Sequence, residues 1–245
     1  MAREPIFNVP AGVVAAIGLI VLVHGGLTWL VDDEQGRLKI MLAFIPARYS
    51  GLAAELPGGE PAAWWSLLTH QFVHGDLTHL VLNSAWLLAF GSPVAARIGS
   101  VRFALLFLAC GVAGAAAFLA IRYGEAVPMV GASGAISGLM GAAFRFFFNG
   151  DEASGPGSVR DDPRSVQRMS LAETFGDRRV LMMIVTWIAA NFVTAAMVYY
   201  LSAGAGIAWE AHLGGFLLGL LAFQLFDRPQ ILPQVPPDEE RQTLH

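Results

Sequence analysis

Three small groups of polar residues in this sequence have the types and spacing needed for acyl-transfer chemistry. They are Ser133 within a Gly-Ala-Ser-Gly sequence, His212, and the pair His79 and Asn83. A serine hydroxyl is a weak nucleophile unless an adjacent base accepts its proton, and a neutral imidazole is the natural base near neutral pH. Amide and imidazole N–H groups can hold the oxyanion that develops in acyl transfer. These residue types therefore indicate hydrolysis by a serine nucleophile.

The composition places this chemistry in a membrane protein. Apolar residues make up 55% of the 245 residues, and the mean hydropathy is +0.56. Charged residues make up only 14%, against about 25% in soluble domains. The formal net charge of -4 does not indicate a basic surface for binding nucleic acid. The single cysteine excludes an intrachain disulfide. We expect the lipid bilayer, and no nucleic acid, as a partner.

Hydropathy predicts an all-α polytopic membrane protein with six transmembrane helices. The predicted spans are residues 10–31, 77–91, 101–121, 133–148, 180–201 and 209–226. Together they form one domain, 10–226, between a short segment 1–9 and a proline-rich tail 227–245 for which we predict disorder. Two long connections, 32–65 and 150–179, interrupt this domain.

The basic residues predict the orientation of these spans. With the N-terminus in the cytoplasm, eleven of the fifteen Lys and Arg residues lie on the cytoplasmic side. The four on the outer side are Arg37, Lys39, Arg48 and Arg122. Both termini and the loop 150–179 are then cytoplasmic, and the loop 32–65 is external. A six-helix plan without further domains favours a bacterial inner membrane. Within the cytoplasmic loop, Ser170 and Glu173 have the spacing of a capping box.

The topology predicts a common depth for the polar groups. Even-numbered spans run inward, and Asn83, Ser133 and His212 all lie near the starts of such spans. If Arg145 anchors at the inner interface, the twelve residue steps to Ser133 span about 18 Å. Ser133 would then lie roughly 10 Å below the outer interface of a hydrocarbon core about 30 Å thick. Because hydrolysis needs water, we infer a cavity that opens outward above the serine.

Small residues predict which helices meet. Gly215 and Gly219 lie three and seven residues after His212, on the same helical face, and such a pair lets another backbone approach closely. Ser133, Ser137 and Gly141 form a comparable small face on the fourth span. Two such faces in contact would bring Ser133 within reach of His212. The glycines assigned to helix packing are Gly131, Gly134, Gly215 and Gly219.

Taken together, these motifs resemble those of rhomboid intramembrane serine proteases over roughly residues 10–226. The residues that carry the resemblance are His70, His74, His79, Asn83, Gly131, Ala132, Ser133, Gly134, Ala211, His212, Gly215 and Gly219. The resemblance implies a six-helix rhomboid-like bundle with Ser133 as nucleophile and His212 as general base, without a third carboxylate. It implies that His79, Asn83 and the Ser133 amide hold the oxyanion.

The resemblance also implies single-pass transmembrane protein substrates and no metal or cofactor. The fifth span and the first loop would frame substrate access. Two positions depart from the family pattern. Ser137 stands where an aromatic ring usually stacks on the histidine, a role that Trp209 could take over, and Ser66 stands where the first loop often has Arg.

Several residues have structural interpretations that compete with functional ones. We interpret His70 and His74 as partners of loop backbone groups, with a direct role in the site as the alternative. We interpret Asn191 and Thr194 on the fifth span as helix packing, with substrate gating as the alternative. Glu210 lies two residues before His212 and should point away from the helical face that carries His212. It is therefore not assigned as a third catalytic group.

Two other functions compete with proteolysis. A catalytically impaired rhomboid-like protein could bind and retain membrane clients, although intact Ser133 and His212 argue against it. A small transporter or channel predicts charged residues deep in several spans and internal repeats, and the sequence has neither. The sequence also lacks the His-Glu-x-x-His motif of zinc proteases and an Asp within an apolar span.

Overall fold

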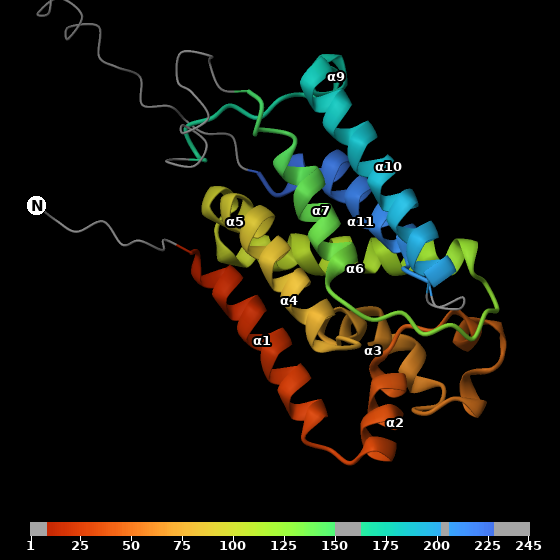
Figure 1. The fold of residues 1–245 in the computed structure, drawn as a ribbon. Helices are drawn as coiled ribbons and strands as arrows, with labels where there is room; N and C mark the ends of the chain where they lie inside the picture. Colours follow the sequence, from red (N-terminus) through yellow and green to blue (C-terminus); the bar gives the residue numbers. More distant parts are fainter. Residues whose placement is uncertain (1–8, 150–162, 202–205, 228–245) are drawn as a thin grey trace, which may run out of the picture.

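The computed structural model describes residues 9–149, 163–201 and 206–227. Within this part the regular secondary structure is helical, apart from one isolated antiparallel bridge between Phe44 and Met129 (Figure 1). The α-helices are α1 (Ala11–Thr28), α2 (Asp32–Leu42), α3 (Pro61–Thr69), α4 (Leu77–Trp86), α5 (Ser92–Ile98), α6 (Ser100–Ile121), α7 (Ser133–Ala143), α9 (Leu171–Gly176), α10 (Arg178–Leu201) and α11 (Trp209–Ala222). The shorter segments are the 3-10 turns η1 (Pro46–Ser50), η2 (Ala53–Glu55), η3 (His70–Phe72) and η6 (Phe223–Leu225), and the π-helical η4 (Leu87–Gly91).

Four described stretches are long and apolar enough to cross a membrane: α1, α6, α10 and the continuous run 77–98 formed by α4, η4 and α5. The other two predicted spans contain the shorter helices α7, of 11 residues, and α11, of 14 residues. The all-α fold class is confirmed, and the chain is an integral multi-pass membrane protein. The second span is longer than predicted because the π turns of η4 join it to α5, where Pro93 takes a first-turn position that needs no N–H.

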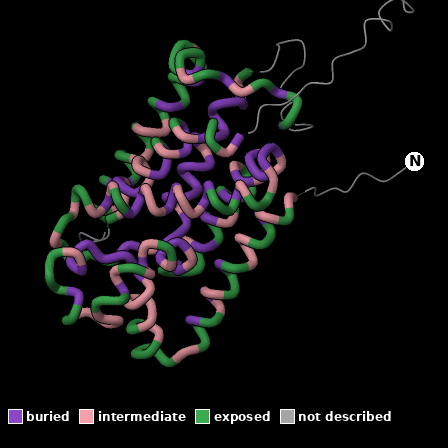
Figure 2. The backbone as a smooth tube through the Cα atoms, turned by 180° about the vertical axis from the view of Figure 1, so that it is seen from behind, coloured by how far each residue is buried: buried purple, intermediate pink, exposed green. Residues whose placement is uncertain are grey.

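The core forms where α6, α7 and α11 pack together, and glycine occupies the closest contacts. A Cβ atom at Gly215 would overlap the carbonyl of Gly134, and one at Gly219 would overlap the carbonyl of Gly138. On α6, a Cβ at Gly114 would lie 2.7 Å from a carbonyl of α11. Figure 2 shows buried residues concentrated in the middle of the bundle and exposed residues along its outer helices. The glycines thus allow the central helices to approach at backbone distance.

The connection 32–65 is largely helical, since it contains α2, η1, η2 and the start of α3. It is organised around Arg48, which is buried and donates hydrogen bonds to the carbonyls of Ile40, Pro57 and Gly59. Burial lowers the pKa of this guanidinium. The Trp65 indole N–H adds a hydrogen bond of 2.9 Å to the Met41 carbonyl. This segment packs below α4 and α6 at one end of the bundle (Figure 1).

At the opposite end two charged residues are buried, and the assignment of Asp227 to the disordered tail is wrong. Arg145 is fully buried within the protein and donates to the carbonyls of Met169 and Leu220. Asp227, assigned to the tail, is buried and forms a two-pronged ion pair with Arg97. A buried guanidinium needs fixed acceptors, and the carbonyls beside it supply them.

The capping box that begins α9 is confirmed. Ser170 Oγ accepts from the Glu173 N–H at 3.1 Å, and the Glu173 carboxylate accepts from the Ser170 N–H at 2.6 Å. These hydrogen bonds lower the pKa of Glu173. The predictions for the N-terminal segment 1–8, for the start of the cytoplasmic loop and for the tail beyond residue 227 fall outside the described residues.

Candidate active site

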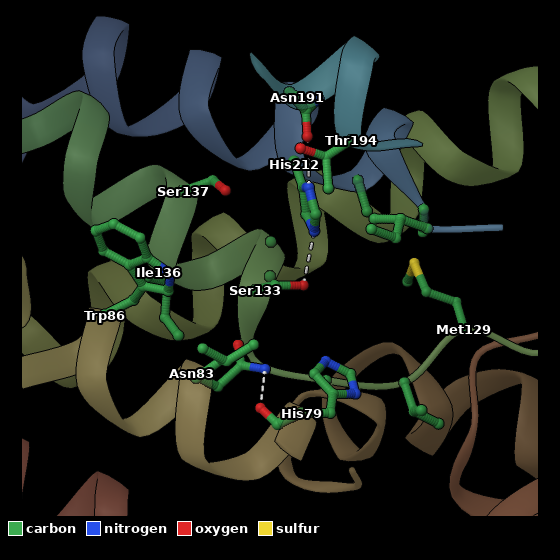
Figure 3. A pocket seen from close by; sticks show the side chains of 18 of the residues that line it. His79, Asn83, Trp86, Met129, Ser133, Ile136, Ser137, Asn191, Thr194 and His212 are labelled. Atoms are coloured by element: carbon green, nitrogen blue, oxygen red, sulfur yellow. Dashed lines mark hydrogen bonds between the residues drawn. The ribbon is translucent and has the colours of Figure 1, made fainter. Parts of the chain in front are cut away.

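Ser133 and His212 are in hydrogen-bond contact. The Ser133 Oγ atom lies 2.8 Å from the Nε2 atom of His212 (Figure 3). Ser133 is the first residue of α7, and His212 is the fourth residue of α11. Both side chains are partly buried, so they face a pocket and not the packed core. Two residues 79 positions apart in sequence thus lie close enough for direct proton transfer.

The glycine contacts between α7 and α11 explain this proximity. Gly134 follows the serine directly, and its carbonyl lies against Gly215, almost one turn beyond the histidine. Gly219 lies against Gly138 one turn further along both helices. The two helices therefore meet along a continuous seam that begins at Ser133 and His212. The predicted packing positions Gly134, Gly215 and Gly219 all lie on this seam.

The structure adds a residue that the sequence analysis had interpreted as packing. The Nδ1–H of His212 donates to Asn191 Oδ1 on α10 at 2.7 Å, and Asn191 Nδ2 donates to the Trp209 carbonyl at 3.3 Å. The signal in the sequence was the spacing of Trp187, Asn191 and Thr194, which repeats every three to four residues and sets all three on one face of the fifth span. All three line the same pocket as His212, and Figure 3 shows Asn191 and Thr194 beside the histidine.

The other candidate partners of His212 have contacts elsewhere. Glu210 is buried and ion-pairs with Arg122 at 2.7 Å, in agreement with its predicted orientation. Trp209 does not replace the missing aromatic ring, because its indole packs on Phe192 with ring centroids 4.6 Å apart. Within the described ranges, no aromatic ring contacts His212. The suggestion that Trp209 stacks on the histidine is therefore wrong.

His79 and Asn83 lie on α4, across the pocket from Ser133 (Figure 3). One N–H of the Asn83 amide donates to the His79 carbonyl at 2.9 Å, which leaves the second N–H of that amide outside this bond. Asp76 caps α4 by accepting from the His79 backbone N–H at 2.8 Å. Two of the predicted oxyanion donors are thus held by one short helix facing the serine.

Gly131 differs from the other predicted packing glycines. It precedes α7 and has a φ of +116°, which residues with a side chain rarely adopt. A Cβ atom here would lie 2.6 Å from the Nε2 atom of His79. Gly131 therefore makes room for the imidazole of His79 and lets the chain turn into α7, and it does not pack helix against helix.

The pocket that these residues share has a volume of about 760 Å³. It is bounded by α4, α7, α10 and α11 and by the segment that precedes α7. Trp86, Met129, Ile136 and Trp187 contribute apolar surface. Figure 3 shows the polar side chains of His79, Asn83 and His212 around Ser133. An apolar pocket with a few convergent polar groups is the usual form of a ligand site.

His70 also lines this pocket, whereas His74 does not. The His70 Nδ1–H donates to the Ser66 carbonyl at 2.8 Å, and the His70 carbonyl accepts from the Gly131 N–H at 2.9 Å. His70 thus satisfies loop backbone groups. Burial lowers the pKa of both His70 and His74 to about 4. His74 packs edge-on against the His79 ring, and in the described part of the chain no cluster of three or more ligating side chains could hold a metal ion.

A helical bundle that spans the membrane and holds a serine–histidine pair in an internal pocket defines a polytopic protein with the parts of a serine hydrolase. The sequence pattern of the Rhomboid domain matches residues 61–228, which is more than half of the chain. The chain therefore belongs to the rhomboid family.

Similar proteins support this assignment. Rhomboid protease GluP of Bacillus subtilis (strain 168) is 42% identical over 80 residues, which are 32% of this chain and 15% of that protein. RHOMBOID-like protein 4 of Arabidopsis thaliana is 29% identical over 166 residues, which are 67% of this chain and 35% of that protein. Putative rhomboid protease YdcA of Bacillus subtilis is 36% identical over 78 residues, which are 32% of this chain and 39% of that protein. The chain thus spans less than half the length of each of these relatives.

Proposed function

We propose that this chain is an intramembrane serine endopeptidase that hydrolyses peptide bonds in or near the transmembrane segments of single-pass membrane proteins. The observation that carries the proposal is the 2.8 Å contact between Ser133 Oγ and His212 Nε2 inside a pocket bounded by four helices. Membership of a family that includes proteins named as proteases supports it. A serine that contacts an imidazole has the base that it needs to become a nucleophile.

Acylation follows from this contact. Ser133 Oγ attacks the carbonyl carbon of the scissile peptide while its proton passes to His212 Nε2. The tetrahedral intermediate then collapses: the C–N bond breaks, and the imidazolium returns the proton to the leaving amine. One fragment departs with a free amino group, and the other stays bound to Ser133 as an ester.

Deacylation reverses the proton path. A water molecule attacks the ester carbonyl, and His212 Nε2 accepts one of its protons. The C–Oγ bond breaks, Ser133 recovers a proton from the imidazolium, and a carboxylic acid leaves. Water reaches the serine through the pocket, which fits the cavity predicted above Ser133. No step requires a metal or a cofactor.

The developing oxyanion has three candidate donors. The backbone N–H of Ser133 lies at the start of α7, where a helix has no internal acceptor for it and the dipole favours negative charge. The second N–H of Asn83 and the imidazole of His79 approach from α4. Removal of one oxyanion donor typically lowers kcat by about 10²- to 10³-fold, so Asn83→Ala should fall in that range.

Localisation is part of this proposal. The bias of basic residues favours a protein with both termini in the cytoplasm, and we assign it to a bacterial inner membrane. Substrates would then be cut near the outer surface of the membrane.

The deciding experiment is cleavage of a model single-pass substrate in proteoliposomes. Wild type should cleave it, whereas Ser133→Ala and His212→Ala should not. Ser137→Ala is the matched control: it removes the same hydroxyl one helical turn away, from the same pocket, and should retain activity. Cleavage that survives in Ser133→Ala would refute the proposal. Binding of the substrate without cleavage by wild type would favour the alternative of an impaired rhomboid-like protein that retains membrane clients.

A further inference from the structure

We infer that Asn191 on α10 is a positioning residue that fixes the tautomer and orientation of His212. The inference rests on the proposed function, because it concerns the group proposed as general base. It adds a third polar side chain, from a third helix, to the pair formed by Ser133 and His212.

The Trp209 carbonyl fixes which way the Asn191 amide points. A carbonyl oxygen only accepts hydrogen bonds, so the amide atom 3.3 Å from it must be the nitrogen. The other end of the amide, Oδ1, then faces His212 at 2.7 Å. The contact with the Trp209 carbonyl, which can only accept, therefore sets the orientation of this amide.

The amide orientation in turn fixes the proton on the imidazole. Because Asn191 Oδ1 cannot donate, the His212 nitrogen that faces it must carry the hydrogen, and that nitrogen is Nδ1. A neutral imidazole with its hydrogen on Nδ1 has a free electron pair on Nε2, which is the atom that faces Ser133 Oγ. The chain of bonds from Trp209 to Ser133 therefore holds His212 in the one neutral tautomer that can accept the serine proton.

Asn191 also restrains the plane of the ring. Within the described ranges, His212 makes side-chain hydrogen bonds to Ser133 and Asn191, one at each nitrogen, and no aromatic ring contacts it. Glu210, the nearest carboxylate in sequence, is ion-paired with Arg122. Without Asn191 the imidazole could rotate or take the other tautomer, in which Nε2 carries the hydrogen and cannot act as base.

The test measures the reactivity of Ser133 separately from substrate cleavage. A small fluorophosphonate labels an activated serine without needing a transmembrane substrate, so its labelling rate reports on the activation of Ser133 and not on the binding of a substrate helix. Asn191→Leu keeps a similar volume and removes the acceptor. It should lower the labelling rate and kcat together by more than about 10-fold, with little change in KM; the loss of about 10⁴-fold in a serine protease with the wrong histidine tautomer sets the upper limit.

Asn191→Asp is the conservative variant. It keeps an acceptor oxygen toward Nδ1, so it should recover most of the labelling rate lost in Asn191→Leu. A carboxylate at this distance favours the imidazolium, so the pH at which labelling becomes half-maximal should move upward. A merely structural role would produce neither the recovery nor the shift.

Tyr199→Phe is the matched control, since it removes a polar group from α10 at an exposed residue that does not line the pocket. It should label at the wild-type rate. Wild-type labelling by Asn191→Leu would overturn the inference, even if substrate cleavage were lost. If Asn191→Leu fails to fold, the pH profile of Asn191→Asp decides, and an unshifted profile overturns the inference. Failure of the proposed function looks different: wild type itself would not label, or Ser133→Ala would label equally.

Discussion

Position 131 has room for a hydrogen atom and no more. The Gly131 backbone has a φ of +116°, and a Cβ atom there would lie 2.6 Å from His79 Nε2. A residue with a side chain at positive φ costs roughly 1–2 kcal/mol, and the overlap would also displace the His79 ring from the pocket. Gly131→Ala should therefore lower the Tm in detergent and reduce fluorophosphonate labelling of Ser133 by at least about 10-fold, as for the loss of an oxyanion donor.

Gly124→Ala separates the two effects. Gly124 also has positive φ, +82°, but a Cβ atom there would lie no closer than 3.7 Å to its nearest neighbour, Ser50 Oγ. This variant should lose stability to a similar extent and keep the wild-type labelling rate. Equal labelling rates for the two variants would show that the contact between Gly131 and His79 has no part in activity.

His70 gives the fold a dependence on pH. Burial lowers the pKa of its imidazole from 6.5 to about 4, so the neutral form persists in the folded protein while the unfolded chain takes up a proton. The unfolded state then binds more protons between these two values, and stability falls as the pH falls. From pH 6.5 to pH 5 the loss is about 1–2 kcal/mol. We expect a lower Tm at pH 5 than at pH 7.

His70→Gln keeps a donor for the Ser66 carbonyl but removes the titrating group, so its Tm should change less between pH 7 and pH 5. Thr69→Val is the control, because it removes the hydrogen bond of Thr69 to the Leu42 carbonyl and leaves the imidazole in place. Its Tm should be lower at both pH values, with the wild-type difference between them. If His70→Gln shows the wild-type difference, burial of this imidazole is not its source.

At the residue scale, the sequence was most informative where one residue type has one chemical use. Ser133 and His212 were predicted to meet from their motifs and from topology, and they lie in contact. Asn191 was interpreted as packing because a single amide on an apolar helix has several uses, and only the facing helix decides between them. The assignment of Gly131 to helix packing was wrong for a similar reason: its neighbour, His79, comes from another helix.

At the scale of helices, hydropathy located all six apolar segments but not their boundaries. A period of 3.6 residues and a length of apolar sequence do not reveal the π turns of η4, which carry the second span on into α5. The segment 32–65 also lacked a clear helical pattern, since α2 is rich in charged residues. The conformation of this segment depends on the hydrogen bonds between its carbonyls and Arg48. Contacts distant in sequence decided both features.

The seam between α7 and α11 determines whether Ser133 and His212 meet. A Cβ atom at Gly219 would overlap the carbonyl of Gly138, so Gly219→Ala must push the helices apart. Overpacking of this kind typically costs about 1–3 kcal/mol. The variant should unfold at lower temperature in detergent and should label Ser133 more slowly, because the separation of the two helices lengthens the contact between Oγ and Nε2.

Gly18→Ala is the matched control for this substitution. Gly18 lies in α1 with no atom within 4 Å of an added Cβ, so alanine there should be neutral or should stabilise the helix by up to about 1 kcal/mol. Labelling should stay at the wild-type rate. An equally stable, equally reactive Gly219→Ala would contradict the close seam.

At the scale of the whole molecule, a buried ion pair ties the end of the chain's last described segment to the bundle. Arg97 on α5 binds both carboxylate oxygens of Asp227 and also donates to the carbonyls of Pro163 and Val166. Both side chains of the pair are almost fully buried. The guanidinium thus joins three segments that are distant in sequence: α5, the chain after α11 and the chain before α9.

Removal of one member of this pair should loosen all three segments together. Asp227→Asn leaves a buried guanidinium without its counter-charge, which costs about 3–5 kcal/mol when a buried pair is broken. We expect a large fall in Tm and faster proteolysis within residues 163–170, which precede α9. Glu125→Gln, which breaks the exposed pair with Arg122, should cost no more than about 1 kcal/mol. If Asp227→Asn and Glu125→Gln lower the Tm equally, the buried Arg97–Asp227 pair stabilises the protein no more than an exposed pair does. The segment before α9 must then be held by its remaining contacts.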